Sequence, residues 1–267
     1  MFVCHDGEFF PVDQKLFDAT NRSFKWGDGL FETMKIMDGT ILLEHLHFDR
    51  FFQGLHMLGI KSGSGSEEVQ EKILKLCKKN HCLGAARVRL SAYRKEDHSA
   101  GYVIEGVPIS AELNSWNSRG WTLGIYPYSR KSTDALSNLK SANYLPYVLA
   151  AIHAKQNQLD EALVLNTENK IADASKANIF LIKKAEVFTP ALNQGCVQGV
   201  MRRHLIEQFK ILGLPVRQEE ISEQDLNEAE EIFLTNALYG MRWVQQFNQT
   251  TYGCSQSIEL YRKTFPG

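Results

Sequence analysis

The sequence predicts an α/β or α+β fold built from two lobes. Short apolar runs at the period of a strand alternate along the chain with apolar faces at helical spacing. Between Tyr128 and Leu139 the chain turns polar, which marks the best candidate for a domain boundary. We therefore expect an N-terminal α/β domain over residues 1–127, an interdomain loop over 128–139 and a C-terminal domain over 140–267.

The elements of the first half follow from hydrophobic periodicity. Gly29–Met37 alternates polar and apolar residues like a strand, and the Asp38-Gly39 pair that follows is typical of a hairpin turn. Residues 47–58 carry apolar side chains three and four apart, which predicts a helix with one buried face. A second helix is expected to start near Ser66, after a flexible Ser-Gly connection. Further strands are predicted over 87–93 and 121–126.

The second half opens with a predicted helix over 144–156, which carries Leu145, Val148, Leu149 and Ile152 on one side. Another helix is expected to open at Gly199–Arg202 and to run toward Phe209. Strands are predicted over 162–166, 178–183 and 186–189, and the stretch from Asp225 to Leu234 leads into another.

The composition favours small-molecule ligands. With 30 basic and 31 acidic side chains the formal net charge is −1, which gives no long-range attraction for nucleic acid or anionic membranes. No stretch approaches the roughly 18 uninterrupted apolar residues of a membrane span, and the N-terminus lacks the pattern of a signal peptide. The 5 cysteines are scattered and odd in number. We therefore expect a cytoplasmic protein with reduced thiols and without a metal site.

Lys140 is the most informative single residue. It lies among small and apolar residues with no acid beside it, a setting in which a lysine can have a lowered pKa and act as a nucleophile. The alternative is a lysine at the edge of a helix that reaches into water. The order of the motifs around Lys140 decides between these interpretations.

These motifs are Trp26–Thr33, His47–Arg50, Lys140, Asp173–Phe180, Gln198–Arg202 and Thr235–Leu238. In this order, from about Val12 to Val244, they resemble the class IV aminotransferase family. These pyridoxal-phosphate enzymes include branched-chain and D-amino-acid aminotransferases and aminodeoxychorismate lyase. The resemblance implies the two-domain fold of that family, with pyridoxal 5'-phosphate in the cleft between the lobes, and a homodimer.

The resemblance also implies roles for single residues. Lys140 corresponds to the Schiff-base lysine, which also moves protons at the reacting carbon of the substrate. Asp173 falls where most members carry a glutamate that keeps the pyridine nitrogen protonated; a turn-forming aspartate is the alternative. Arg50 corresponds to an arginine on the cofactor phosphate, for which a planar guanidinium is well suited.

Backbone amides and a tyrosine complete the implied cofactor site. Val200 and Met201 lie where a helix N-terminus would receive the phosphate, and Asn236 and Ala237 correspond to a second phosphate-facing turn. Tyr144 is a candidate for the phenolic oxygen of the cofactor, although a tyrosine here could equally be packed in the core.

Within the family the motifs are closest to aminodeoxychorismate lyase, which converts 4-amino-4-deoxychorismate to 4-aminobenzoate plus pyruvate in folate biosynthesis. Phe31 and Arg94 are the candidate substrate contacts. However, the Phe31-Glu32 pair is shared with the aminotransferases, so a branched-chain or D-amino-acid aminotransferase is the alternative. A remote alternative is a non-catalytic relative that only binds a ligand, supported by Asp173 in place of glutamate.

Overall fold

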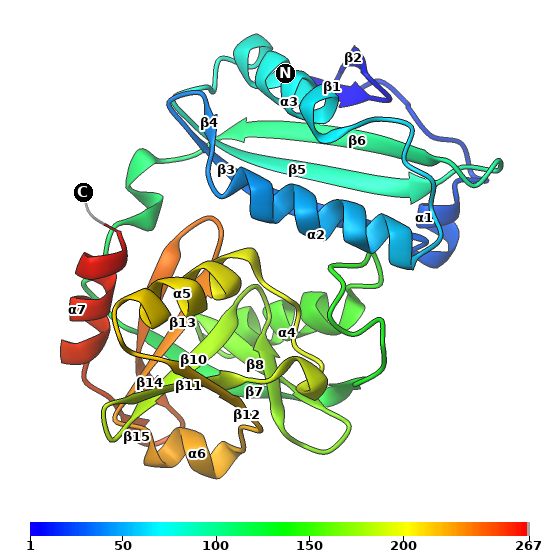
Figure 1. The fold of residues 1–267 in the computed structure, drawn as a ribbon. Coiled ribbons are helices and arrows are strands. Elements are labelled where there is room, and N and C mark those ends of the chain that lie inside the picture. Colours follow the sequence, from blue (N-terminus) through cyan, green and yellow to red (C-terminus); the bar gives the residue numbers. More distant parts are fainter. Residues whose placement is uncertain (266–267) are drawn as a thin grey trace. The chain divides into compact units, whose positions relative to one another are not determined.

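The computed structural model describes residues 1–265, apart from the side chain of Asn114. The chain forms two compact units (Figure 1). The first unit comprises residues 1–113 and 140–143, and the second unit comprises residues 114–139 and those from 144 onward. Both units combine strands with helices, so the predicted mixed α/β class is confirmed.

The first unit contains an antiparallel sheet, which in the described residues has six strands in the order β2-β1-β6-β5-β3-β4. Helices α2 and α3 pack against it (Figure 1). The strands are β1 (Phe2–His5), β2 (Glu8–Pro11), β3 (Gly29–Met37), β4 (Thr40–Ile41), β5 (Ala85–Arg94) and β6 (Ala100–Pro108). The helices are α1 (Arg22–Trp26), α2 (Glu44–Met57) and α3 (Ser66–Lys79).

The core of the first unit confirms the periodicity of β3 and α2. Met34 and Ile36 of β3 are buried together with Phe48 and Phe51 of α2, which puts the predicted helix face against the sheet. The helix starts at Glu44, earlier than the periodicity indicated. The hairpin turn after β3 is confirmed, since Asp38 and Gly39 have φ values of 47° and 75° and the turn needs positive φ at both positions.

The second unit contains a mixed sheet, which in the described residues has nine strands. Its order is β12-β11-β10-β13-β14-β7-β8-β9, and β15 pairs with β14. The strands are β7 (Trp121–Lys131), β8 (Glu161–Asn166), β9 (Ile171–Ala174), β10 (Asn178–Lys183), β11 (Glu186–Pro190), β12 (Val216–Glu219), β13 (Glu231–Asn236), β14 (Gly240–Phe247) and β15 (Thr250–Thr251). The helices are α4 (Leu145–Gln156), α5 (Val200–Ile211), α6 (Glu223–Glu228) and α7 (Ser255–Thr264), and a short 3-10 turn covers η2 (Leu192–Gln194). Another 3-10 turn, η1 (Ala111–Asn114), ends the first segment of the first unit.

The division into units differs from the boundaries expected from the sequence. Strand β7 belongs to the second unit because it runs parallel to β14 and β8 and is hydrogen-bonded to both. It continues through the polar residues up to Lys131, which the sequence suggested as loop. Conversely, Lys140–Asn143 belongs to the first unit, because Ser141 forms a β-bridge with Leu30.

The structure adds detail to two elements expected in the second unit. The apolar residues Leu145, Val148, Leu149 and Ile152 of α4 are exposed, and the helix packs through its tyrosine and alanines at 147, 150 and 154 instead. The stretch from Asp225 begins as helix α6, where a Ser222 capping box ends the preceding loop, and only Glu231 starts the strand. None of the helices among the described residues has the length and apolar character of a membrane span.

Candidate active site

Lys140 is held in the first unit by strand-like backbone pairing. Its carbonyl accepts a hydrogen bond from the amide of Phe31 at 2.9 Å, and Ala142 donates to the carbonyl of Gly29 at 2.9 Å. The segment thus extends the edge of β3, and the Lys140 amine lies 4.5 Å from the centroid of the Phe31 ring. This pairing fixes the lysine on the same side of the sheet as Phe31.

A cation that the motifs did not indicate lies on the same ring. The guanidinium carbon of Arg89 is 3.8 Å from the Phe31 ring centroid. The register of β3 and β5 explains this contact, since Phe31 opposes Ser91 and Thr33 opposes Arg89, so that all these side chains project from one face. Arg89 also donates from Nε to the hydroxyl of Ser91 at 3.1 Å. Phe31 therefore brings Arg89 and Lys140 together.

Arg50 forms a buried ion-pair cluster with Glu32 and His47. Its Nε and NH2 donate to the two carboxylate oxygens of Glu32 at 2.7 and 2.6 Å, and His47 Nδ1 lies 2.8 Å from Glu32 Oε2. Burial alone would raise the pKa of Glu32, but Arg50 and His47 outweigh it and lower that pKa to about 2. Glu32 thus fixes the guanidinium of Arg50 through two parallel hydrogen bonds.

Arg94, the predicted substrate contact, lies at the end of β5. Its Nε is 3.0 Å from Asp28 Oδ2, and its other nitrogens donate to the carbonyls of Leu58 at 2.7 Å and Gly59 at 2.9 Å. These contacts join the loop after α2 to the start of β3. The guanidinium of Arg94 is thus used to hold loops of the first unit, whereas that of Arg89 lies beside Phe31.

Asp173, in β9, is the centre of a polar cluster in the interior of the second unit, where it is 2% exposed. Its Oδ2 accepts hydrogen bonds from the Tyr147 hydroxyl at 2.6 Å and from the amide of Val197 at 2.8 Å. Its Oδ1 accepts from the side-chain amide of Asn178 at 2.7 Å. The Lys131 amine is 3.5 Å from Oδ2. This set of partners is far larger than a turn-forming aspartate requires.

The charges of Asp173 and Lys131 are shaped by burial and by each other. Burial raises the pKa of Asp173, and Lys131 together with the three hydrogen bonds offsets part of that rise. Burial likewise lowers the pKa of Lys131, and the attraction of Asp173 opposes it. Removal from water thus pushes both groups toward their neutral forms, while their proximity favours the ion pair.

Tyr144 and Tyr147 lie on each other at the start of α4. Their ring centroids are 4.4 Å apart and the ring planes are inclined by 26°, which is a stacked pair. Tyr144 is the residue before the first turn of the helix, and Tyr147 points from that turn to Asp173. Tyr147, not singled out from the sequence, is thus the tyrosine of this pair that contacts the predicted carboxylate.

The N-terminus of α5 lies next to this cluster through Asn178. Helix α5 begins at Val200 with Gly199 as its N-cap, so the amides of Val200 and Met201 have no acceptor within the helix. A Cβ on Gly199 would fall 1.8 Å from Asn178 Oδ1, so only glycine permits this approach. Asn178 donates both to Asp173 and to the Val197 carbonyl, which couples the helix start to the carboxylate.

The second predicted phosphate turn lies between β13 and β14. Asn236 ends β13, and its Oδ1 accepts hydrogen bonds from the amides of Leu238 at 2.9 Å and Tyr239 at 3.1 Å. Its amide group donates to the carbonyl of Lys176 at 3.0 Å. The side chain of Asn236 therefore builds the turn itself, and Ala237 follows it in the loop.

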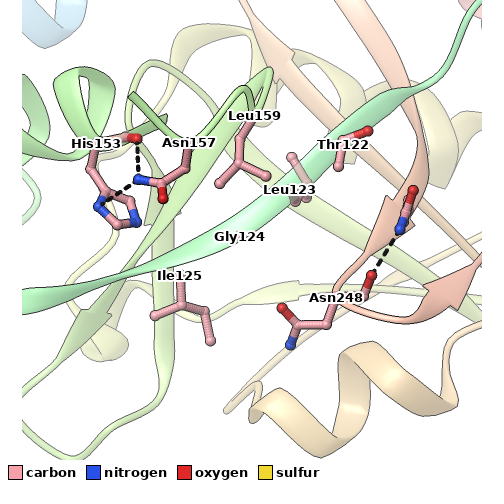
Figure 2. Close-up of a pocket in the computed structure, with 9 residues that line it drawn as sticks. Thr122, Leu123, Gly124, Ile125, His153, Asn157, Leu159 and Asn248 are labelled. Carbon is pink, nitrogen blue, oxygen red and sulfur yellow. Dashed lines mark hydrogen bonds between the residues drawn. The ribbon is translucent and has the colours of Figure 1, made fainter. Parts of the chain in front are cut away.

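A pocket of about 380 Å³ elsewhere in the second unit contains none of these residues (Figure 2). The lining residues are Thr122, Leu123, Gly124, Ile125, His153, Asn157, Leu159, Gln246 and Asn248. His153 is the one titratable side chain in this lining, and Asn157 bonds to its carbonyl at 2.9 Å. Lys140 and Asp173, the predicted site residues, therefore lie outside this pocket.

Several residues of these clusters were not predicted. Arg89 follows Arg87 at the two-residue spacing of a strand, but its contact with Phe31 depends on the register of β3 and β5. Tyr147 was placed only in a helix, and Lys131 only in a polar loop. Lys131 is the last residue of a strand that begins with apolar residues, and this position could have indicated it. The polar residues just before Lys131 hide the continuation of the strand.

Comparison with known proteins identifies the family to which the chain is similar. Residues 29–247 match the amino-transferase class IV family. A putative branched-chain-amino-acid aminotransferase of Methanocaldococcus jannaschii is 27% identical over 88% of this chain and 84% of its own length. An aminodeoxychorismate lyase of Vibrio harveyi is 28% identical over 83% of each chain. The branched-chain aminotransferase structure of Thermoproteus uzoniensis superposes with a TM-score of 0.88 at 22% identity, covering 98% and 94% of the two chains.

The fold and the match over most of its length define a pyridoxal-phosphate-dependent transaminase or lyase. The chain belongs to the class IV aminotransferase family. The expected family, fold and cofactor are thereby confirmed. Transaminases and lyases both occur among its relatives, at similar identity.

Proposed function

We propose that this protein binds pyridoxal 5'-phosphate and converts 4-amino-4-deoxychorismate to 4-aminobenzoate plus pyruvate. The cofactor, when bound, supplies an electron-withdrawing ring that stabilises negative charge at the substrate carbon. The residues of the chain provide binding, orientation and proton transfer. Its action on a small-molecule amine follows from the family, and the lyase reaction is our choice within it.

The donors and acceptors present in the two units fit this cofactor. Asp173 is a buried carboxylate of the kind that a pyridine nitrogen needs as a partner. The α5 N-terminus offers the amides of Val200 and Met201, and the missing side chain at Gly199 leaves the close approach open. We assign the phosphate to these amides, to the turn at Asn236 and Ala237, and to Arg50.

Lys140 is our candidate for the covalent attachment of the cofactor and for proton transfer. Its position on Phe31 holds the amine on a hydrophobic ring, and Arg89 on the same ring adds a second positive charge nearby. In its neutral form an amine is a nucleophile. The neutral amine can also accept the proton that leaves the ring carbon of the substrate.

The observation that carries the choice of substrate is the Arg89–Phe31–Lys140 stack. Aminodeoxychorismate has two carboxylates, and the face of the sheet that bears Phe31 also bears Arg89, Arg87 and Lys35. A guanidinium can bind a carboxylate through two parallel hydrogen bonds, so Arg89 would hold one acid group of the substrate beside the lysine. Phe31 would pack against the ring of the substrate. We therefore prefer Arg89 to Arg94 for substrate recognition.

A branched-chain or D-amino-acid aminotransferase is the second candidate. It is favoured by the 27% identity to the putative branched-chain enzyme and by the buried carboxylate Asp173, which suits a reaction that retains charge on the ring. The same lysine and phosphate donors would serve it. The two candidates differ in whether the amino group leaves with the product or stays on the cofactor.

The test is to supply aminodeoxychorismate to the holoenzyme and to measure both products together with the absorbance of the cofactor. A lyase yields 4-aminobenzoate and pyruvate in equal amounts, and the cofactor keeps its aldehyde oxidation state. A transaminase is converted to the pyridoxamine form by an amino donor without an acceptor. Rapid conversion by leucine, valine or D-alanine, with no product from aminodeoxychorismate, would reject the lyase in favour of the transaminase.

We also propose a cytoplasmic homodimer that contributes to folate biosynthesis. The scattered free thiols support a reducing compartment. Sedimentation of the purified holoenzyme at two concentrations tests the dimer, and a monomer at both would contradict it.

A further inference from the structure

Lys131 places an amine in the interior of the second unit that no role assigned above uses. It ends β7, and its side chain is 11% exposed. Its amine is buried and, among the described residues, has no partner in hydrogen-bonding geometry. The nearest acid oxygen is Oδ2 of Asp173 at 3.5 Å, within the range of an ion pair. The amine also lies 5.1 Å from the Tyr147 ring centroid.

The carboxylate that faces Lys131 is already well supplied with donors. A carboxylate has about four lone-pair positions, and three of those on Asp173 accept from Tyr147, Val197 and Asn178. All three donors are neutral, so they orient the negative charge without cancelling it. Lys131 is in ion-pair contact with Asp173 and is the charged group that acts most strongly on this carboxylate. The buried Arg202 guanidinium at the start of α5 also interacts electrostatically with Asp173, without an ion-pair contact, so removing the charge of Lys131 changes the net charge of the site while that of Arg202 stays.

The net charge around Asp173 affects the proton affinity of any basic nitrogen that lies against this carboxylate. An isolated carboxylate favours the protonated form of a nearby nitrogen, because the positive ring and the negative oxygen attract. A carboxylate already paired with an ammonium attracts a proton less, and the ammonium itself repels the positive ring. The Cys196 thiol also faces this cluster, but burial raises its pKa to about 12, so it adds no charge near neutral pH.

We propose that Lys131 is a positioning residue that balances the charge of Asp173 and so lowers the proton affinity of the pyridine nitrogen of the bound cofactor. This inference rests on the proposed binding of pyridoxal 5'-phosphate. A ring nitrogen with less positive charge is a weaker electron sink. It suits a reaction that expels a leaving group as soon as the proton is removed, and it disfavours the longer-lived charge that transamination requires.

The test uses pyridoxal 5'-phosphate labelled with ¹⁵N in the ring, bound to the holoenzyme and observed by NMR. The ¹⁵N resonance distinguishes a protonated from an unprotonated pyridine nitrogen directly, without turnover. Lys131→Met keeps the length of the side chain and removes its charge, and it should move the resonance toward the protonated position and raise the apparent pKa of the ring. Lys131→Arg keeps the charge and should stay near wild type.

A matched control is Lys183→Met, because Lys183 forms an ion pair with Asp225 at 2.9 Å in the same unit. This variant should leave the ¹⁵N resonance unchanged. Equal ¹⁵N positions and pH profiles in wild type and Lys131→Met would overturn the proposal. So would an equal displacement in Lys183→Met, since the effect would then be a general one.

A second measurement on the cofactor-free protein keeps the test decisive if cofactor binding fails. Lys131→Met, Asp173→Asn and the double variant form a double-mutant cycle in chemical denaturation. The expected result is coupling, with the double variant destabilised less than the sum of the single variants. Additive effects would overturn the charge pairing. Coupling in this cycle with no cofactor bound by the wild type would instead reject the proposed function and, with it, the effect on the ring nitrogen.

Discussion

The Tyr147 hydroxyl donates a 2.6 Å hydrogen bond to Oδ2 of Asp173, and both residues are buried in the second unit. Tyr147→Phe should therefore leave a buried charge short of one donor. We expect a loss of about 1–3 kcal/mol in the free energy of unfolding and weaker cofactor binding. Tyr128→Phe is the control, since Tyr128 is 79% exposed. Equal stability of the two variants would show that this hydrogen bond does not matter.

The bidentate contact between Arg50 and Glu32 allows the structural and cofactor roles of Arg50 to be separated. Arg50→Ala should cost about 3–5 kcal/mol in stability, because it removes a partner of a buried carboxylate. Adding Glu32→Gln removes that charge and should restore part of the loss. If Arg50 also binds the cofactor phosphate, affinity in equilibrium dialysis stays low in the double variant. Recovery of full cofactor affinity would limit Arg50 to a structural role.

The low pKa of Glu32 predicts an acid-dependent stability. Its pKa is about 2 in the folded chain against an ordinary value of 4.5. A lowered carboxyl pKa stabilises the fold above the ordinary value, and this contribution is lost as pH falls from about 4.5 to about 2. Its size at neutral pH is on the order of 3 kcal/mol. Denaturation of wild type and Glu32→Gln should converge toward pH 2, and a constant difference across pH would contradict the assignment.

The close approach of Gly199 to Asn178 predicts a sensitive position. A methyl group at Gly199 would meet Asn178 Oδ1 at 1.8 Å, so Gly199→Ala must displace the amide that holds Asp173. We expect a loss of about 1–3 kcal/mol in stability and reduced cofactor affinity. Gly84→Ala is a matched control, because nothing lies within 4 Å of a Cβ there. Indistinguishable behaviour of the two variants in denaturation and dialysis would rule out this constraint.

Local patterns predicted much of the fold but not its division into units. The apolar alternation of Gly29–Met37 and the helical face of α2 depend only on neighbours in the sequence, and both were predicted correctly. The compact units divide before β7 and not after it, because β7 pairs with β14, a partner far along the chain. The apolar side of α4 is exposed, because the helix packs into the second unit through Tyr147 and small alanines and not through its leucines. The sequence of the helix alone does not show which side is buried.

The residues of the candidate site likewise fall into those that the sequence could indicate and those that it could not. Asp173 and Gly199 could be singled out because each belongs to a motif that is continuous in sequence. Arg89 and Lys131 could not, because their contacts depend on strand register and on which side chain meets another across the sheet. Charge pairs formed across long sequence separations leave no periodic signal.

Attachment of the cofactor to Lys140 is the step on which the proposed mechanism depends most. The measurement is borohydride reduction of the holoenzyme, followed by proteolysis and peptide mapping by mass spectrometry. We predict the pyridoxyl group on Lys140 in stoichiometric amount, and none on Lys131, the lysine that contacts Asp173. Label on Lys131 or on any further lysine, or no label at all, would contradict the account.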